Sequence, residues 1–237
     1  MKTLVFDIFG DYGHFRKYYT TSSPLTFSFP PPSTVKGMLG AIAGIDKKEY
    51  LKVFSSSNCN IAIRILNPVK KIRMGLNLIN TKGNFWIPYK MKNHEARTQV
   101  RAEFVKDAAY RIYFAHKDND LFEDVIDKIK NHKNVYTLSL GLSEMLADYK
   151  FVGIYDSHEV KYVEVDILSV LPFEFIVEDK IYFEKGKKYF KEKIPMDMNE
   201  DRVVLSYQDV LYEANGQSIK CHVMKCWEVN GEHVIFF

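Results

Sequence analysis

GDYGHFRKYYTTSSPLTFSFPPPSTVKGMLGAIAG, residues 10–44, decides how the first part of the chain folds. Proline fixes φ and pushes the preceding residue into extended geometry, so no helix passes through residues 29–32. Ser33 or Thr34 then serves as a favoured N-cap, and apolar residues recur at helical spacing over residues 35–42. The stretch therefore predicts a helix over residues 34–43.

The predicted helix carries glycine and alanine along one side, at Gly37, Gly40 and Ala41. Glycine inside a helix costs about 1 kcal/mol relative to alanine, so we expect this bare side to pack closely against a sheet. The helix N-terminus presents free N–H groups and the positive end of the helix dipole, with Lys36 beside them. The helix start is therefore a candidate phosphate site; that Ser33 and Thr34 serve only as caps is an equal alternative.

The segment before the prolines combines three kinds of side chain that handle nucleic acid: cations, stacking rings and hydroxyls. They are His14, Arg16, Lys17, Tyr18, Tyr19, Thr20, Thr21, Ser22 and Ser23. A solvated linker has no need of this combination. It favours a loop that contacts nucleic acid.

Length and composition limit the class of protein. The chain has 237 residues, 46% of them apolar, which is enough for one large domain or two small ones. Three cysteines form no disulfide framework, and no two of the seven histidines have metal-ligand spacing, so we expect no metal and no cofactor. With no signal peptide and no membrane-spanning run visible, the sequence predicts a cytoplasmic protein without a membrane partner.

Charge is concentrated in residues 68–104. This segment has eight basic and two acidic residues, a net charge of +6 against +3 for the whole chain, so the remainder carries −3. The segment also holds Phe85, Trp86 and Tyr89 near a predicted turn at residues 82–84, a mixture that suits single-stranded nucleic acid. A solvated basic hairpin without a ligand is the alternative. The candidate residues here are Lys70, Lys71, Arg73, Lys82, Trp86, Lys90, Lys92, Arg97 and Arg101.

The order of predicted elements indicates an α+β protein. Strands are expected at residues 2–9, 60–66, 72–79, 98–105, 110–115 and 151–155, and helices at 34–43, 47–54, 121–129 and 143–147, the third capped by Asp118 or Asn119. Strand, helix, strand, hairpin, strand, helix, strand is the ferredoxin-like plan. We therefore expect a ferredoxin-like domain over residues 1–162, with an inserted β-hairpin at residues 68–104.

Beyond residue 163 only strands are predicted. They cover residues 163–168, 174–177, 180–183, 203–212, 218–227 and 233–236. Asn215-Gly216 and Asn230-Gly231 favour type I′ turns, which need positive φ at both central residues. The lysine-rich residues 185–193 are interpreted as a solvated loop. A small antiparallel β-domain is expected over residues 163–237.

Four segments carry a resemblance to a known family: the N-terminal strand at residues 2–9, residues 13–44, RTQVRAEFVKDAAYRIYFAH at 97–116 and YTLSLGLSE at 136–144. Together they resemble the Cas-five family of CRISPR-associated proteins, most closely the branch found with type I-B Cascade. The resemblance covers the first 155 residues in order, whereas the C-terminal part matches in general character only.

The resemblance implies a RAMP subunit with an RRM-like ferredoxin fold and a β-hairpin thumb. Such subunits cap the 5′ handle of the CRISPR RNA (crRNA), hold the thumb across the guide and contact the backbone and large subunits of Cascade, which meets target DNA through the guide. Residues 14–21 with Ser33, Thr34 and Lys36 then become the handle-binding surface, and residues 68–104 the thumb. No aromatic RNP motif is visible on the predicted strands, so ordinary RRM sheet-face readout is not expected.

A rival reading is a metal-independent endoribonuclease, because one branch of the family cleaves precursor crRNA with a tyrosine, a lysine and a histidine. Such chemistry needs a base, an acid and a cation. Tyr50, His116 and Lys117 are the candidate parts. The His-Lys order reverses the Lys-His pair of the cutting branch, so we expect a binding protein rather than an enzyme.

Overall fold

The computed structural model describes residues 1–81, 87, 89–92 and 94–237 and shows an α+β protein with more strand than helix. Two of the predicted site residues, Lys82 and Trp86, lie outside the described residues. The elements of the first part are β1 (Lys2–Gly13), α1 (Pro32–Ala43), α2 (Tyr50–Val53), β2 (Cys59–Ile65), β3 (Lys70–Ile79), β4 (Arg97–His116) and α3 (Asn119–Lys130). Those of the second are β5 (Asp148–Ile167), β6 (Leu171–Pro172), η1 (Phe173–Phe175), β7 (Ile176–Tyr182), β8 (Tyr189–Met198), β9 (Val204–Glu213), β10 (Ile219–Val229) and β11 (Glu232–Val234).

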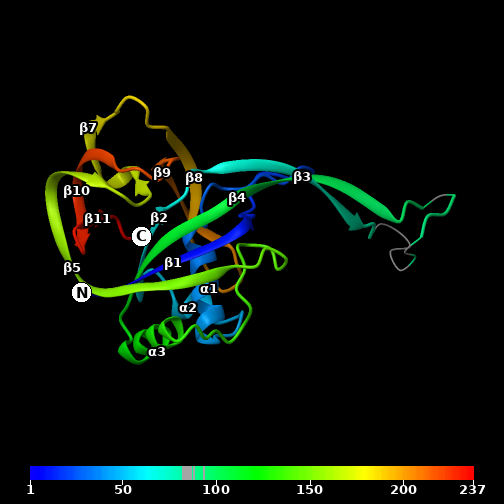
Figure 1. Cartoon of the computed structure of the whole chain (residues 1–237), viewed down its shortest axis with the longest axis horizontal. Helices are drawn as coiled ribbons and strands as arrows, with labels where there is room; N and C mark the ends of the chain where they lie inside the picture. Colours follow the sequence, from blue (N-terminus) through cyan, green and yellow to red (C-terminus); the bar gives the residue numbers. More distant parts are fainter. Residues whose placement is uncertain (82–86, 88, 93) are drawn as a thin grey trace.

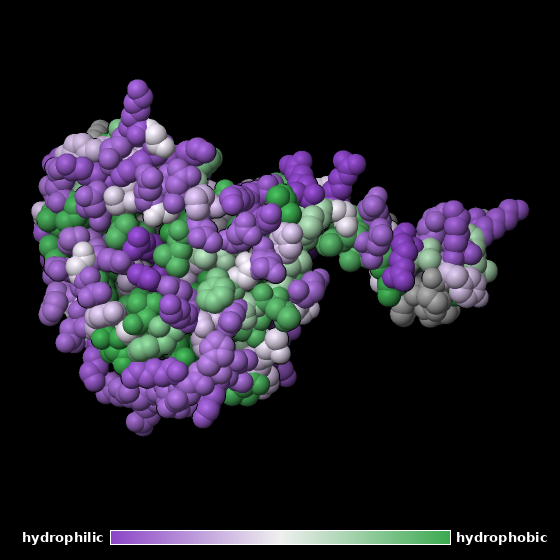
Figure 2. Space-filling view, in the orientation of Figure 1, coloured by the Kyte–Doolittle hydropathy of each residue, from purple (hydrophilic) through white to green (hydrophobic). Residues whose placement is uncertain are grey.

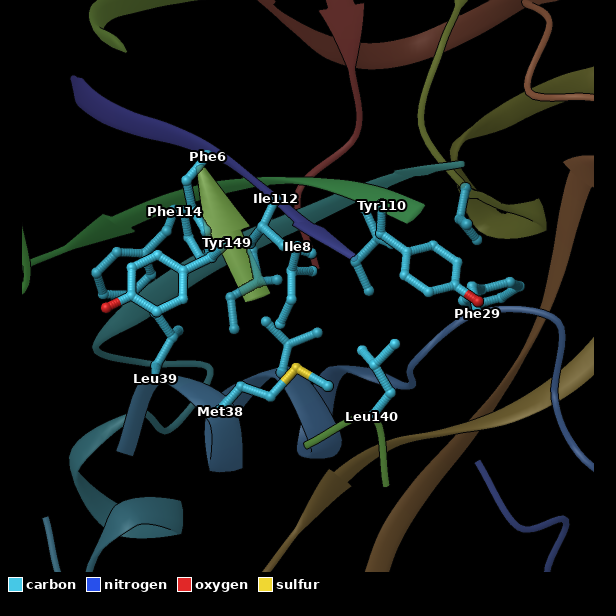
Figure 3. Close-up of a cluster of buried hydrophobic side chains, with 14 of the residues drawn as sticks. Phe6, Ile8, Phe29, Met38, Leu39, Tyr110, Ile112, Phe114, Leu140 and Tyr149 are labelled. Atoms are coloured by element: carbon cyan, nitrogen blue, oxygen red, sulfur yellow. The ribbon is translucent and has the colours of Figure 1, made fainter. Parts of the chain in front are cut away.

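A central sheet in the order β2-β4-β1-β5, with every neighbouring pair antiparallel, organises the molecule. Alternate residues of a strand face opposite sides, so Leu4, Phe6 and Ile8 of β1 all face the helices. Figure 3 shows Phe6 and Ile8 above Met38 of α1, and all of these side chains are buried. The main core therefore lies between this sheet and the helices, which Figure 1 shows below it.

Helix α1 begins two residues earlier than predicted. Pro31 is its N-cap and Pro32 its first residue, and no side chain caps it, so the expected cap at Ser33 or Thr34 is wrong. Proline suits the first helical turn because its missing N–H would have no partner there. The helix ends before Gly44, whose φ of 81° is the left-handed conformation that glycine adopts readily.

The bare side of α1 packs against α2 rather than against a sheet. A Cβ on Gly40 would lie 3.0 Å from the Cβ of Tyr50, and one on Gly37 would lie 3.7 Å from its ring. The glycines therefore let the Tyr50 ring rest on the helix. Close packing was predicted correctly, but its partner was not.

Helix α3 follows its prediction closely. The Asp118 carboxylate accepts hydrogen bonds from the backbone N–H groups of Asp120 (3.0 Å) and Leu121 (3.2 Å), as an N-cap does. The segment predicted as helical at residues 143–147 forms turns instead.

A long hairpin arm, which we define as β3, its partner residues 97–106 of β4 and the described residues between these strands, projects from the body (Figure 1). The two strands pair without a break from Lys70 opposite Lys106 to Ile79 opposite Arg97. The strands predicted at 98–105 and 110–115 are one continuous strand, β4, which serves the arm with its first half and the central sheet with its second. The arm is thus a direct extension of the central sheet.

The second half of the chain continues from the same sheet. Strand β5 pairs with β1 at its start and with β10 at its end, and the predicted domain boundary at residues 162/163 lies inside it, where Tyr162 has a φ of 48°. A smaller sheet has the order β6-β9-β8. Residues 189–198 form β8, so the solvated loop predicted at 185–193 is wrong over its last five residues.

The two predicted type I′ turns differ. Asn230 and Gly231 both have positive φ, as the prediction requires. At the other turn Gly216 has a positive φ but Asn215 does not, so that turn is of another type.

Side chains from β8 and β9 complete the main core. Ile194, Met196 and Val210 belong to the same buried cluster as Phe6 and Ile8. Tyr212 also reaches this core: its hydroxyl lies 2.7 Å from the Ser28 hydroxyl, and its ring is 5.3 Å from that of Phe29. The segment before α1 is therefore held in place by the last third of the chain.

Candidate nucleic-acid interface

The loop between β1 and α1 is folded back on itself. The Phe15 N–H donates to Thr26 Oγ1 (2.9 Å), the Phe27 N–H to the Phe15 carbonyl (2.8 Å) and the Lys17 N–H to the Leu25 carbonyl (2.9 Å). Because Phe15 and Phe27 are buried, the loop is anchored at its base. Its tip, residues 18–23, is left on the surface.

The tip presents two of the predicted RNA-contacting rings to solvent. Tyr18 is 50% exposed and Tyr19 is 58% exposed. Arg16 is also exposed, and its guanidinium donates to the Thr20 carbonyl (3.0 Å), while Thr20 Oγ1 donates to the Lys17 carbonyl (2.8 Å). Arg16, Tyr18 and Tyr19 are therefore available to a ligand, whereas the Thr20 hydroxyl serves the turn.

Two other predicted contacts of this loop face inward. His14 is buried, its ring Nδ1 lying 2.7 Å from the Glu103 carbonyl. Lys17 forms an ion pair with Glu192 of β8, and both side chains are largely buried. Burial lowers the pKa of Lys17, but the hydrogen bond and the charge of Glu192 outweigh it, so that pKa lies above its ordinary value. These two residues position the loop rather than face a ligand.

The base of the arm is tied to the same loop. The Lys71 ammonium donates to the Thr26 carbonyl (2.8 Å) and lies 3.7 Å from the Glu103 carboxylate, and the Glu103 N–H donates to the Pro24 carbonyl (2.9 Å). Burial lowers the pKa of Lys71 despite the nearby acids. Lys71 is therefore a structural cation, and the loop and the arm share one fixed junction.

A groove of about 520 Å³ lies at this junction. Arg73 and Arg101 of the arm line one side, and the hydroxyl-bearing Ser23 lines the other. Arg73 lies 3.9 Å from the Glu103 carboxylate. Both arginines line this groove together with residues 23–25 of the loop, so two segments that are distant in the chain border the same groove.

The rest of the arm carries exposed cations. Lys70 lies 3.4 Å from Asp107 and Lys90 2.8 Å from Glu95. Lys92, Arg97 and Arg101 are exposed and form no ion pair within the described residues. Figure 2 shows hydrophilic side chains along much of the arm. The arm therefore carries exposed cations, as the charge of residues 68–104 predicts.

The N-terminus of α1 opens into a second pocket, of about 410 Å³. Its lining includes Ser33, Thr34, Tyr50 and Arg202. The Ser33 hydroxyl is in a residue only 7% exposed and has no hydrogen-bond partner among the described residues. No sequence motif marks Arg202, which reaches this pocket only because β8 and β9 lie beside α1.

Lys36, the predicted phosphate contact, does not line that pocket. It is 3% exposed, and its ammonium lies 2.9 Å from the Asp197 carboxylate and 3.4 Å from the Ser56 hydroxyl. The Lys36–Asp197 pair joins α1 to β8.

The three candidate nuclease residues are arranged as follows. The Tyr50 ring rests on α1 in the 410 Å³ pocket. His116 Nε2 lies 3.1 Å from the Val53 carbonyl, and its Nδ1 accepts from the Asp118 N–H (3.0 Å). Lys117 is exposed. Both ring nitrogens of His116 are therefore engaged with backbone groups.

The outer face of the central sheet is occupied by an ionic network. Arg111 donates to both carboxylate oxygens of Asp7 (2.8 and 3.1 Å), and Arg64 donates to Glu232 (2.7 Å). The Tyr113 hydroxyl donates to the same Glu232, and burial together with this carboxylate raises the pKa of Tyr113. This network occupies the face on which an RRM stacks bases, in line with the missing aromatic motif.

Metal-binding groups, reactive thiols and membrane-spanning helices were considered for the described residues. They contain no group of three or more His, Cys, Asp or Glu side chains able to hold a metal ion. Cys59, Cys221 and Cys226 are free and buried, and burial raises the pKa of the Cys59 thiol to about 12. None of the helices in the described ranges combines the length and the apolar character needed to cross a membrane.

The fold is similar to that of solved structures, of which two are described here. One is described as a crystal structure of a CRISPR protein from Archaeoglobus fulgidus, with 16% identity, 98% of this chain and 97% of that chain covered, and a TM-score of 0.56. The other is a chain of a CRISPR RNA-guided surveillance complex, with 11% identity, 92% and 91% coverage, and a TM-score of 0.54. The fold is thus one found among CRISPR-associated proteins.

A family model described as CRISPR-associated protein (Cas_Cas5) matches residues 3–210. The chain belongs to this family, as the resemblance of its N-terminal segments predicted. A search of curated protein sequences gave no match.

Proposed function

We propose that the chain is a non-catalytic subunit of a type I CRISPR surveillance complex, of the I-B kind, that binds and caps the 5′ handle of the crRNA. Its partners are the handle, the backbone and large subunits, and target DNA reached through the guide. One observation carries this proposal: Ser23, at the end of the exposed tip, and the arm cations Arg73 and Arg101 line one groove, and the same tip exposes the rings of Tyr18 and Tyr19. Stacking rings beside cations are what single-stranded RNA requires.

The strand order supports a ferredoxin-like assignment for the core of the subunit. Strands β2, β4, β1 and β5 are antiparallel neighbours, and α1 and α3 are the connections that the plan requires. In this reading the hairpin arm is the thumb that lies across the guide.

The proposed RNA contacts divide by chemistry. Bases stack on Tyr18 and Tyr19, and phosphates meet Arg16 and the arm. The pocket at the start of α1 adds Ser33, Thr34 and Arg202, because an arginine and two hydroxyl-bearing residues suit a phosphate. The arm contacts are Arg73, Lys90, Lys92, Arg97 and Arg101.

The capping role is tested by the RNA that the chain retains. Purified from a host expressing a CRISPR array, the protein should carry RNA with one uniform 5′ end inside the repeat. The variant Arg16→Ala/Tyr18→Ala/Tyr19→Ala should lose this RNA while its far-UV circular dichroism is unchanged, because all three side chains are exposed. RNA with scattered 5′ ends on the wild-type protein would contradict capping.

We expect no cleavage of precursor crRNA, with or without EDTA. Attack by a 2′-hydroxyl needs an acid and a base at the scissile phosphate, and both His116 nitrogens are directed to backbone groups. The assay is denaturing electrophoresis with analysis for a 2′,3′-cyclic phosphate end. Metal-independent cutting that His116→Ala or Tyr50→Phe abolishes would establish the endoribonuclease instead.

A further inference from the structure

Three tyrosines from distant parts of the chain form one surface cluster. The Tyr18 ring centroid lies 5.1 Å from that of Tyr19 and 4.8 Å from that of Tyr207, which β9 contributes. Tyr207 is 40% exposed, so all three rings face solvent in part. We call Tyr18, Tyr19 and Tyr207 the tyrosine cluster.

A buried ion pair holds the cluster together. Lys17 precedes Tyr18, and its partner Glu192 lies on β8, the strand paired with β9. Successive residues of a strand face opposite sides, so Lys193 points away from Glu192. The Lys193 ammonium lies 5.8 Å from the centre of the Tyr207 ring. The Lys17–Glu192 pair is thus largely buried, whereas Lys193 and the three tyrosine rings lie at the surface.

The surroundings of the cluster are positive. Lys193 forms no ion pair within the described part of the chain, and Arg16 is exposed beside Tyr18. The acid nearest in register, Asp209, is already paired with Lys191 (2.8 Å). Aromatic rings next to cations that form no ion pair suit single-stranded nucleic acid, because the rings can stack on bases and the cations can meet phosphates.

We propose that Tyr207 and Lys193 extend the RNA site onto the β8–β9 hairpin, with Tyr207 stacking one base of single-stranded RNA beside those on Tyr18 and Tyr19. This inference rests on the proposed function. It assigns a direct RNA contact to the C-terminal part of the chain. Leu205 of β9 and Val203, which directly precedes this strand, are exposed apolar residues that fit a protein partner better, so a protein-only role for the strand is one outcome of the test.

The test measures binding of the full chain to oligoadenylate of roughly 12 nucleotides and to an abasic oligomer of equal length. Tyr207→Ala should weaken oligoadenylate binding roughly five- to a hundredfold, as loss of one stacked base does. It should leave abasic binding unchanged, because that binding uses phosphates only. Tyr207→Phe keeps the ring and should keep the affinity. The matched control is Tyr182→Ala. Tyr182 is a strand tyrosine outside the cluster, and its 42% exposure is close to that of Tyr207.

The outcomes separate this inference from the proposed function. If Arg73→Glu/Arg101→Glu weakens binding but Tyr207→Ala does not, the RNA function stands and the assignment of Tyr207 is wrong. If Tyr207→Ala spares RNA binding but prevents capture of another subunit, the strand is a protein interface. If the wild-type chain binds neither oligomer, both proposals fail.

Discussion

Reversing five arm cations should make RNA binding weaker and much less sensitive to salt. The variant combines Arg73→Glu, Lys90→Glu, Lys92→Glu, Arg97→Glu and Arg101→Glu. Each cation that neutralises a phosphate releases counterions, so the slope of log affinity against log salt should become shallower by roughly 3.5 for five contacts on a single strand. Fluorescence anisotropy from about 50 to 200 mM salt measures this slope.

A matched control reverses five exposed lysines away from the arm. They are Lys47, Lys48, Lys52, Lys133 and Lys161. Net charge changes equally in both variants, so long-range repulsion is the same and only local contacts differ. An equal loss of affinity in both variants would show that the arm contributes charge but no dedicated contacts.

Breaking the Lys36–Asp197 pair should destabilise the fold. Lys36→Ala leaves Asp197 of β8 without its ion-pair partner, and removing one member of a fully buried pair typically costs about 3 kcal/mol. Because the Asp197 side chain is 28% exposed and keeps some contact with water, we expect a smaller loss than that. Urea unfolding followed by tryptophan fluorescence measures the loss. Lys36→Met with Asp197→Leu should recover much of it, because apolar side chains of similar size replace the charges.

RNA binding by the folded fraction distinguishes the two roles considered for Lys36. A structural lysine predicts that the Lys36→Met/Asp197→Leu variant binds RNA with wild-type affinity. If that variant is stable yet loses RNA binding, Lys36 contacts a phosphate and must be added to the residues of the proposed RNA site. The neighbouring Ser33→Ala is the comparison, since its hydroxyl does line the α1 pocket.

The fold could be predicted where local signals are strong. The periodicity of α3 and its Asp118 cap, and the positive φ pair at Asn230 and Gly231, are set by a few adjacent residues. Strand β8 could not be predicted because its first half places two aromatic residues before a Lys-Glu-Lys run, and only Ile194 and Met196 show its buried side. Glu192 of this strand is largely buried because it pairs with Lys17, 175 residues away, and no local pattern reveals that contact.

The exposure of several candidate residues could be predicted from the sequence, but the way they assemble could not. Arg16, Tyr18 and Tyr19 are exposed as an RNA loop requires, and the arm has the predicted cations. Composition does not distinguish Lys17, which is largely buried, or Lys71, which is bonded to the Thr26 carbonyl, from lysines without such partners. Tyr207 and Arg202 have no motif, because they join the site only through the pairing of β8 with β9. The roles of Lys82 and Trp86 stay predictions.

The contribution of β8 and β9 to the main core has a consequence for how the chain is made. Tyr212 packs on Phe29, and Glu192 fixes Lys17, so these early residues lack their partners while the ribosome is still adding the last third. A nascent chain exposed only to residue 188 therefore has its arm strands and the strands of the central sheet, but not the partners that hold the loop before α1. Under the proposed function, the RNA-binding surface is completed only at the end of synthesis, so RNA capture waits for the last third of the chain.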